Sequence, residues 1–127
     1  MFEILNDLGR VALDQGDTDR AAALFGESLK LSWEPGSEIG ITLSLVGLAG
    51  VAGELGQPAR AAQLLGVAKA LHESIGRSLT PVEHTVFERY AANIRAQLDD
   101  ATFAMMWAEG QKMTLEQAKA EALGGGG

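Results

Sequence analysis

Apolar residues recur every three or four positions along almost the whole chain, which is the spacing of one face of a helix. The first such stretch lies within residues 2–15, with Ile4, Leu5, Leu8 and Ala12 on one face. Further stretches cover residues 17–32, 38–55, 58–76, 80–98, 99–110 and 114–123. The alternating apolar and polar pattern of a strand does not occur. The pattern therefore predicts an all-α chain of about seven helices.

The breaks between these stretches carry signals for helix ends. A glycine, which tolerates left-handed backbone, follows three of the predicted helices, and capping side chains stand at the start of five. The glycines are Gly16, Gly56 and Gly76, and the caps are Asp17, Ser37, Thr80, either Asp99 or Asp100, and Thr114. Glu83 and Gln117 complete possible capping boxes with Thr80 and Thr114. Local chemistry thus supports short connections between the helices.

One phrase occurs twice, 40 residues apart. GDTDRAAALFG begins at Gly16 and GQPARAAQLLG at Gly56, and six of the eleven positions are identical. A fixed period indicates stacked units, each made here of a helix, a glycine turn and a second helix. Ala21 and Ala61 would let the two helices of a unit approach closely. Leu8 and Leu48 would fill the space beside them.

The spacing resembles the tetratricopeptide repeat (TPR), whose motif is W-x₂-L-G-x₂-Y followed by A-x₃-F. Leu8, Gly9, Ala21 and Phe25 match it in the first unit, and Leu48 and Ala61 in the second. The period of 40 is longer than the 34 residues of a TPR. The resemblance implies TPR-like antiparallel helix hairpins in a short right-handed solenoid. Two hairpins would cover residues 1–76, capping helices 77–123 and a flexible glycine tail 124–127.

Residues 20–123 also resemble the C-terminal region of LuxR-family regulators and related signalling ATPases. The strongest markers are Leu64, Leu65, Gly66, Phe103, Trp107, Glu109, Gly110, Met113, Leu115, Glu116 and Ala118. This resemblance implies a TPR-like scaffold of a bacterial signalling or transcription-regulator protein. The chain has neither a Walker loop nor a basic helix-turn-helix. The ATPase and DNA-reading functions of such regulators are therefore not expected here.

Composition narrows the range of partners. Ten basic residues are scattered among seventeen acidic ones, giving a net charge of −7, which disfavours nucleic acid as a partner. The chain has no cysteine, which fits a reducing cytoplasm and excludes disulfides and thiolate metal sites. Its most apolar run, residues 40–53, is shorter than the roughly 20 residues needed to span a bilayer. The start does not resemble a signal peptide. We expect a cytoplasmic protein without a membrane partner.

No constellation of catalytic residues is evident. His72 and His84 lack the additional ligands that a zinc site needs, and a boundary or surface position is the simpler interpretation. Asp99 and Asp100 are better explained as helix caps than as a catalytic pair. GLAGVAG, residues 47–53, lacks the context of a phosphate-binding loop. We therefore expect no enzyme activity, no metal and no cofactor.

Three other features are better explained by structure than by chemistry. The three-residue spacing of glycines in GLAGVAG predicts close packing against another helix, either in this chain or in a partner. Arg20 and Arg60 would bind a nearby carboxylate or carbonyl rather than a ligand anion. The Phe103, Met106 and Trp107 cluster would belong to the core and leave Met105 exposed. These features predict a packed scaffold.

In a TPR array, the first helix of each pair lines a concave face. The register places Glu3, Asn6, Arg10 and Asp14 there in the first unit, and Leu43, Val46, Gly50 and Glu54 in the second. We expect this face to bind a protein partner or to pair in a homodimer, which makes the chain a non-enzymatic interaction scaffold. The alternative is a small-molecule effector domain. That function requires an enclosed pocket with a few convergent polar groups.

Overall fold

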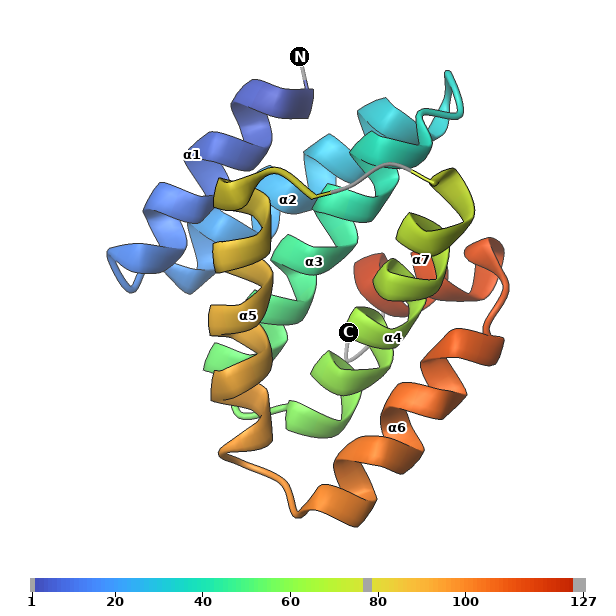
Figure 1. Ribbon diagram of the computed structural model, residues 1–127. Coiled ribbons are helices and arrows are strands. Elements are labelled where there is room, and N and C mark those ends of the chain that lie inside the picture. Colours follow the sequence, from blue (N-terminus) through green and yellow to red (C-terminus); the bar gives the residue numbers. More distant parts are fainter. Residues whose placement is uncertain (1, 77–78, 125–127) are drawn as a thin grey trace.

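The computed structural model describes residues 2–76 and 79–124. Within these ranges the chain forms seven helices and no strand, which confirms the all-α prediction (Figure 1). The helices are α1 (Phe2–Asp14), α2 (Thr18–Trp33), α3 (Glu38–Glu54), α4 (Pro58–Ile75), α5 (Pro81–Arg95), α6 (Asp100–Lys112) and α7 (Leu115–Gly124). Residues 125–127 of the predicted glycine tail lie outside the described residues, whereas Gly124 ends α7.

Consecutive helices from α1 to α4 pack against one another, and α1 also contacts α3. The second half of the chain covers this layer. Helix α5 lies against α3 and α4, whereas α6 runs along α4 (Figure 1). Helix α7 contacts α2, α3 and α4. Helix α3 therefore lies at the centre of the fold.

Each of the first four helices is followed within three residues by a glycine with a positive φ angle, at Gly16, Gly36, Gly56 and Gly76. Left-handed backbone costs glycine little because it has no Cβ. The turns at Gly16 and Gly56 have the same hydrogen bonds: Asp17 N donates to Ala12 O, and Gln57 N to Ala52 O, both over 2.9 Å. This pattern is a Schellman motif, which satisfies the last carbonyls of a helix. The two repeated phrases thus form the same turn.

The later helices begin as the capping signals predict. Thr80 and Glu83 form a complete capping box, and Thr114 exchanges hydrogen bonds with Gln117 in the same way. Two predicted ends were wrong. Helix α5 ends at Arg95 rather than near residue 98, because the chain tightens into i→i+3 bonds there. Helix α6 continues past Gly110 to Lys112.

The alanine seam lies in the core, because Ala21 and Ala61 are both completely buried. The prediction for the leucines beside it holds at one position only. Leu48 is buried, whereas Leu8 is 44% exposed. Helix α1 is the first of the packed helices and has neighbours on fewer sides than α3, so its outer face is left uncovered.

The glycines of GLAGVAG allow close packing within the chain. A Cβ on Gly47 would overlap the ring of Phe25 in α2. A Cβ on Gly50 would stand 2.8 Å from Tyr90 Cε2, and one on Gly53 3.1 Å from Ile94 Cγ1. The prediction of close helix packing is confirmed. The neighbours are α2 on one side and α5 on the other, and the contact with α5 is what positions the site described below.

Candidate functional site

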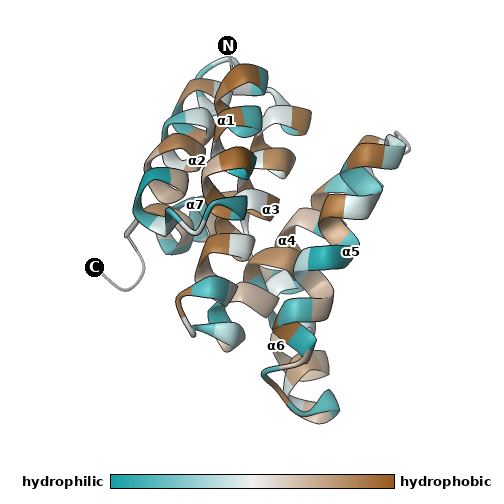
Figure 2. Cartoon of the chain, turned by 90° about the vertical axis from the view of Figure 1, so that its left-hand side faces the viewer, coloured by the Kyte–Doolittle hydropathy of each residue, from teal (hydrophilic) through white to brown (hydrophobic). Residues whose placement is uncertain are grey.

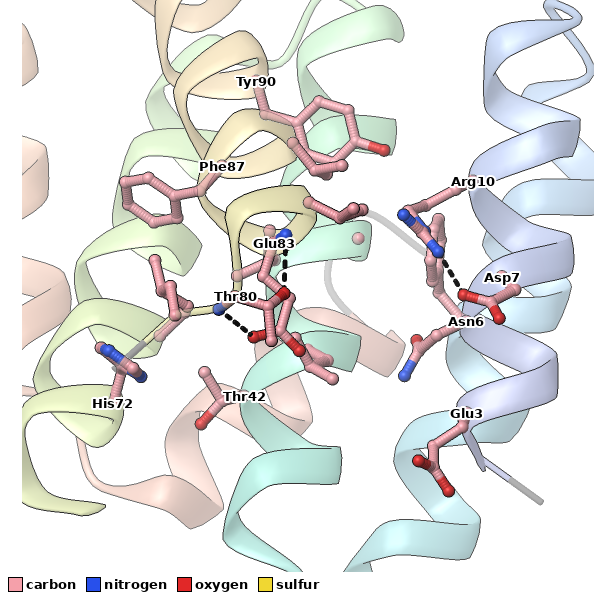
Figure 3. Close-up of a pocket in the computed structure, with 18 of the residues that line it drawn as sticks. Glu3, Asn6, Asp7, Arg10, Thr42, His72, Thr80, Glu83, Phe87 and Tyr90 are labelled. Atoms are coloured by element: carbon pink, nitrogen blue, oxygen red, sulfur yellow. Dashed lines mark hydrogen bonds and ion pairs between the residues drawn. The ribbon is translucent and has the colours of Figure 1, made fainter. Parts of the chain in front are cut away.

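A pocket of about 290 Å³ lies between α1, α3, α4 and α5 (Figure 3). Its apolar lining includes the rings of Phe25 and Phe87 and the side chains of Val46 and Val86. Phe25 lies on α2 and Val46 on α3, whereas Val86 and Phe87 come from α5. The pocket therefore depends on how α5 packs over α3.

The start of α5 is fixed at the edge of this pocket. Thr80 N donates to Glu83 Oε1 over 3.0 Å, and Glu83 N donates to Thr80 Oγ1 over 3.2 Å. Pro81 occupies the first turn, where its missing N–H leaves no bond unmade. Figure 3 shows this capping box among the residues that line the pocket. The capping box fixes where α5 begins, and Val86, Phe87 and Tyr90 follow along the part of the helix that lines the pocket.

Three polar side chains around the pocket have buried atoms without a hydrogen-bond partner. They are both amide atoms of Asn6, the hydroxyl of Tyr90 and Nδ1 of His72. Asn6 and Tyr90 are each 6% exposed, and His72 is half-buried. Leaving a buried polar atom unpaired costs about 1–3 kcal/mol. Such atoms therefore indicate a place where a further hydrogen-bonding molecule would be stabilising.

These groups come from three different helices. Asn6 lies on α1, His72 on α4 and Tyr90 on α5. Figure 3 shows the polar ends of Asn6 and Tyr90 directed toward the space between α1 and α5. The arrangement thus combines an apolar lining with a few convergent polar groups, which is typical of a small-molecule site.

Burial raises the pKa of Tyr90 above its ordinary value, and the nearby Arg89 guanidinium only partly offsets this effect, because its N–H groups approach the phenol oxygen without the geometry of a hydrogen bond. The phenol is therefore neutral at physiological pH. Arg89 also forms an ion pair with Asp14 of α1, with 2.7 Å between Nη2 and Oδ1. Both side chains are more than half exposed, so the pair adds little stability. It nevertheless joins the two helices that flank the opening.

The structure distributes the predicted partner-binding residues over three environments. Those that line the pocket are Glu3, Asn6, Arg10, Leu43 and Val46. Gly50 is covered by Tyr90, and Asp14 pairs with Arg89. Glu54 is exposed at the end of α3 and does not line the pocket. The register of α1 and α3 thus brings together the residues nearer the start of each helix.

Sequence reasoning missed the contribution of α4 and α5. His72, Val86, Phe87 and Tyr90 all line the pocket, yet only the histidine was considered, as a boundary residue. One signal was available. Val82, Val86 and Tyr90 are spaced four residues apart, which places them on one face of α5. The hydrophobic periodicity of α5 does not predict which helices this face packs against.

The other candidates for chemistry have structural roles. Asp99 Oδ1 accepts a hydrogen bond from Thr102 N over 2.6 Å, which lowers the pKa of the carboxyl, so Asp99 caps α6. The Arg60 guanidinium donates to Glu121 O over 2.6 Å and lies 3.3 Å from the Glu121 carboxylate. The structural interpretation of Arg60 is therefore confirmed, although its partner belongs to α7. Arg20 is exposed. Among the described residues, no three His, Asp or Glu side chains form a metal-binding cluster.

The aromatic cluster of α6 belongs to the core, as predicted. Phe103 is buried and stacks on the half-buried Trp107, with 5.7 Å between ring centroids. Trp107 also meets Phe87 of α5 edge to face at 6.2 Å. Met106 packs against the core, whereas Met105 is exposed. The cluster joins α6 to the helix that carries the wall of the pocket.

A second surface feature lies on α1. Ile4, Leu8 and Val11 are 58%, 44% and 53% exposed, and their spacing aligns them along one side of the helix. Figure 2 views the molecule from the side of α1 and shows hydrophobic positions along it. In the internal repeat the corresponding residues of α3 are Ser44, Leu48 and Val51, and all three are buried. The stripe on α1 is thus the uncovered counterpart of a core surface.

Comparisons with known proteins do not extend this description. No protein-family model matches the chain, and neither a curated protein nor a solved structure matches it. In the part of the chain that the structure describes, no helix is long and apolar enough to cross a bilayer. The function must therefore be argued from the geometry.

Proposed function

We propose that this chain is a non-enzymatic regulatory module that binds a small molecule in the pocket between α1, α3, α4 and α5. The observation that carries the proposal is the set of unpaired buried polar atoms on Asn6, His72 and Tyr90 around an apolar cavity. Ligand sites typically combine an apolar lining with a few polar groups that fix orientation. The binding of a ligand to the folded state alone would also stabilise the domain.

The arrangement of the helices supports the same proposal. Helices α1 to α4 pack consecutively, and the turns at Gly16 and Gly56 have the same hydrogen bonds, which supports a repeated unit of the kind that the resemblance implies. In LuxR-family regulators and related signalling ATPases, such regions are taken to be regulatory scaffolds. The pocket and this resemblance together favour a cytoplasmic bacterial regulator whose helical module binds an effector.

The test is a ligand-observed NMR screen of a fragment library, repeated with two variants. Val46→Phe enlarges a side chain that lines the pocket, whereas Leu55→Phe makes a similar change in the exposed turn after α3. We expect fragments that bind the wild type and Leu55→Phe but not Val46→Phe, with circular dichroism confirming that both variants fold. A library with no binder, or binding that survives in Val46→Phe, would contradict the proposal.

A second candidate function is self-association through α1, which the exposed stripe of Ile4, Leu8 and Val11 favours. The occupant we propose is a second copy of this chain. A single apolar stripe can pack against itself about a two-fold axis, as in most homodimers. The repeat-equivalent positions of α3 are buried, which supports the proposal that this side of α1 can also be covered.

Light scattering over a concentration series tests this candidate. We expect a monomer–dimer equilibrium that Leu8→Lys abolishes. Leu55→Lys is the matched control, because Leu55 is also exposed but is the C-cap residue of α3 and not part of the stripe on α1. A monomer at every concentration would exclude the dimer, as would an equilibrium that Leu8→Lys leaves unchanged.

A further inference from the structure

We infer that the pocket takes a small neutral aromatic molecule whose head carries an adjacent hydrogen-bond donor and acceptor, as a primary carboxamide does. Asn6 and Tyr90 would hold the head, and the rings of Phe25 and Phe87 would enclose the body. The inference rests on the proposed function, because it names the chemistry of the ligand for the same pocket.

The side chain of Asn6 sets the requirement on the head. Its carboxamide presents an N–H₂ donor and a carbonyl acceptor side by side, and both are buried without a partner. A ligand group that is only a donor, or only an acceptor, would leave one of them unpaired. A second carboxamide satisfies both at once.

The charges around the pocket favour a neutral head. The two groups that would hold the head are uncharged at neutral pH. One is the amide of Asn6, and the other is the phenol of Tyr90, whose pKa is raised by burial. Arg10 already pairs with Asp7, and Glu83 is held in the capping box of α5. The remaining rim residues Glu3 and Lys69 are of opposite sign. Because Glu3 and Lys69 balance each other, a charged head would lose its hydration without meeting a net opposite charge.

The apolar lining favours an aromatic body. Phe25, Phe87 and Tyr90 contribute three rings to the lining. Aromatic rings gain from offset or edge-to-face contact beyond the area that they bury. A single six-membered ring with a short head fits a pocket of about 290 Å³.

The polar atoms of Asn6 and Tyr90 are shielded from solvent, so the head has to displace a side chain. Figure 3 places Arg10 on the α1 side between these two residues. Arg10 is half-buried and bonds to Asp7 of its own helix rather than to either unpaired group. Because this bond stays within α1, the long Arg10 side chain can move outward without breaking a hydrogen bond between helices.

The experiment compares three ligands that share one ring and differ in the head: benzamide, benzoate and benzylammonium. Affinity is measured from amide chemical shifts of the labelled protein. We expect benzamide to bind at least about tenfold more tightly than either charged ligand, which corresponds to one good hydrogen-bond pair. Asn6→Leu should reduce benzamide affinity by a similar factor, and Tyr90→Phe by several-fold.

The control is Asn93→Leu, which makes the same change at an exposed asparagine of α5 outside the pocket. It should leave benzamide affinity unchanged. Asn6→Leu should also raise the Tm of the free protein, because it removes two unpaired buried polar atoms. Lower affinity with higher stability separates a ligand contact from simple damage to the fold.

The outcomes distinguish the inference from the proposed function. If charged and neutral ligands bind alike, or if Asn6→Leu leaves benzamide affinity intact, the ligand class is wrong although the pocket still binds. The same conclusion follows if the fragment library yields binders but benzamide does not bind. If no small molecule binds at all, the proposed function itself is wrong.

Discussion

The ring of Phe25 in α2 occupies the space that a Cβ on Gly47 of α3 would need. It also lies against α1, where a Cβ on Gly9 would stand 2.8 Å from Phe25 Cε1. One buried aromatic ring is thus held between glycines of two helices. This contact brings α1, α2 and α3 close together, and it places Phe25 in the lining of the pocket.

Gly47→Ala should therefore destabilise the protein by about 1–3 kcal/mol, because the ring has to move out of the way. Phe25→Leu shortens the side chain that blocks the new methyl group. The double variant should be more stable than the sum of the two single changes predicts. Urea unfolding of all four proteins measures this coupling.

The matched control for Gly47 is Gly26, a buried helical glycine of α2. A Cβ there would meet only Leu123 Cδ2, at 3.5 Å, which is an ordinary van der Waals contact. Gly26→Ala should stabilise the protein by up to about 1 kcal/mol through helix propensity. If both alanine variants change stability in the same direction and by the same amount, the tight contact at Gly47 has no energetic weight.

Helices α4 and α6 approach even more closely, through backbone alone. A Cβ on Gly66 would overlap the carbonyl oxygen of Trp107, and one on Gly110 would overlap that of Gln63. Carbonyl groups within helices cannot move aside as a side chain can. We expect Gly110→Ala to destabilise by about 3 kcal/mol, at the upper end for overpacking.

The fluorescence of Trp107 reports on this contact. In a Trp33→Phe background it is the only remaining tryptophan, because the chain has two. The emission of Gly110→Ala should shift to the red as the ring stacked on Phe103 becomes solvated. An unchanged spectrum together with wild-type stability would show that α4 and α6 tolerate a wider separation.

The chain has one tyrosine, so its ionisation can be followed directly by tyrosinate absorbance. Burial raises the pKa of Tyr90, so the folded protein should titrate above the ordinary value of about 10. The tyrosine of the unfolded chain ionises near pH 10, below the pKa of the folded protein. The free energy of unfolding therefore decreases as the pH rises from about 10 through the folded pKa. In Tyr90→Phe this alkaline loss should be smaller. A titration near pH 10 in the folded protein would show that the hydroxyl is solvated.

Asp99 should confer stability with the opposite dependence on pH. The hydrogen bond from Thr102 N lowers the pKa of Asp99, so the ionised cap stabilises α6 above the unfolded pKa. This contribution is lost as pH falls through the folded pKa. Asn caps a helix without titrating, so the stability of Asp99→Asn should approach that of the wild type at acid pH.

The control is Asp100→Asn, next to the cap. Chemical denaturation at several pH values measures both, and parallel curves for wild type and Asp99→Asn would contradict the role of the charge.

Local chemistry was sufficient to predict most of the helices and their caps. Thr80, Asp99 and Thr114 act within one turn of their own position, so the sequence nearby contains the whole signal. The packing of the second half was not predictable in this way. Tyr90 packs on Gly50 and Ile94 packs on Gly53. These contacts depend on how the faces of two separate helices match in shape.

The candidate site shows the same limit. The helical register placed Asn6, Arg10 and Val46 on a common face, and the structure brings them to one pocket. Gly50 shares that register but is covered, because α5 crosses α3 at that point. The unpaired state of Tyr90 and His72 depends on what surrounds each polar atom in space, which a residue pattern does not encode.

Left-handed glycines recur every 20 residues at Gly16, Gly36, Gly56 and Gly76, so α2, α3 and α4, each with its turn, occupy segments of equal length. Inserting one residue into such a helix would rotate everything beyond it by about 100°. An insertion in α3 ahead of Gly47 would turn its glycines away from Phe25 and Tyr90 and point larger residues at them instead. Changes in length should therefore be far less tolerated within these three helices than substitutions.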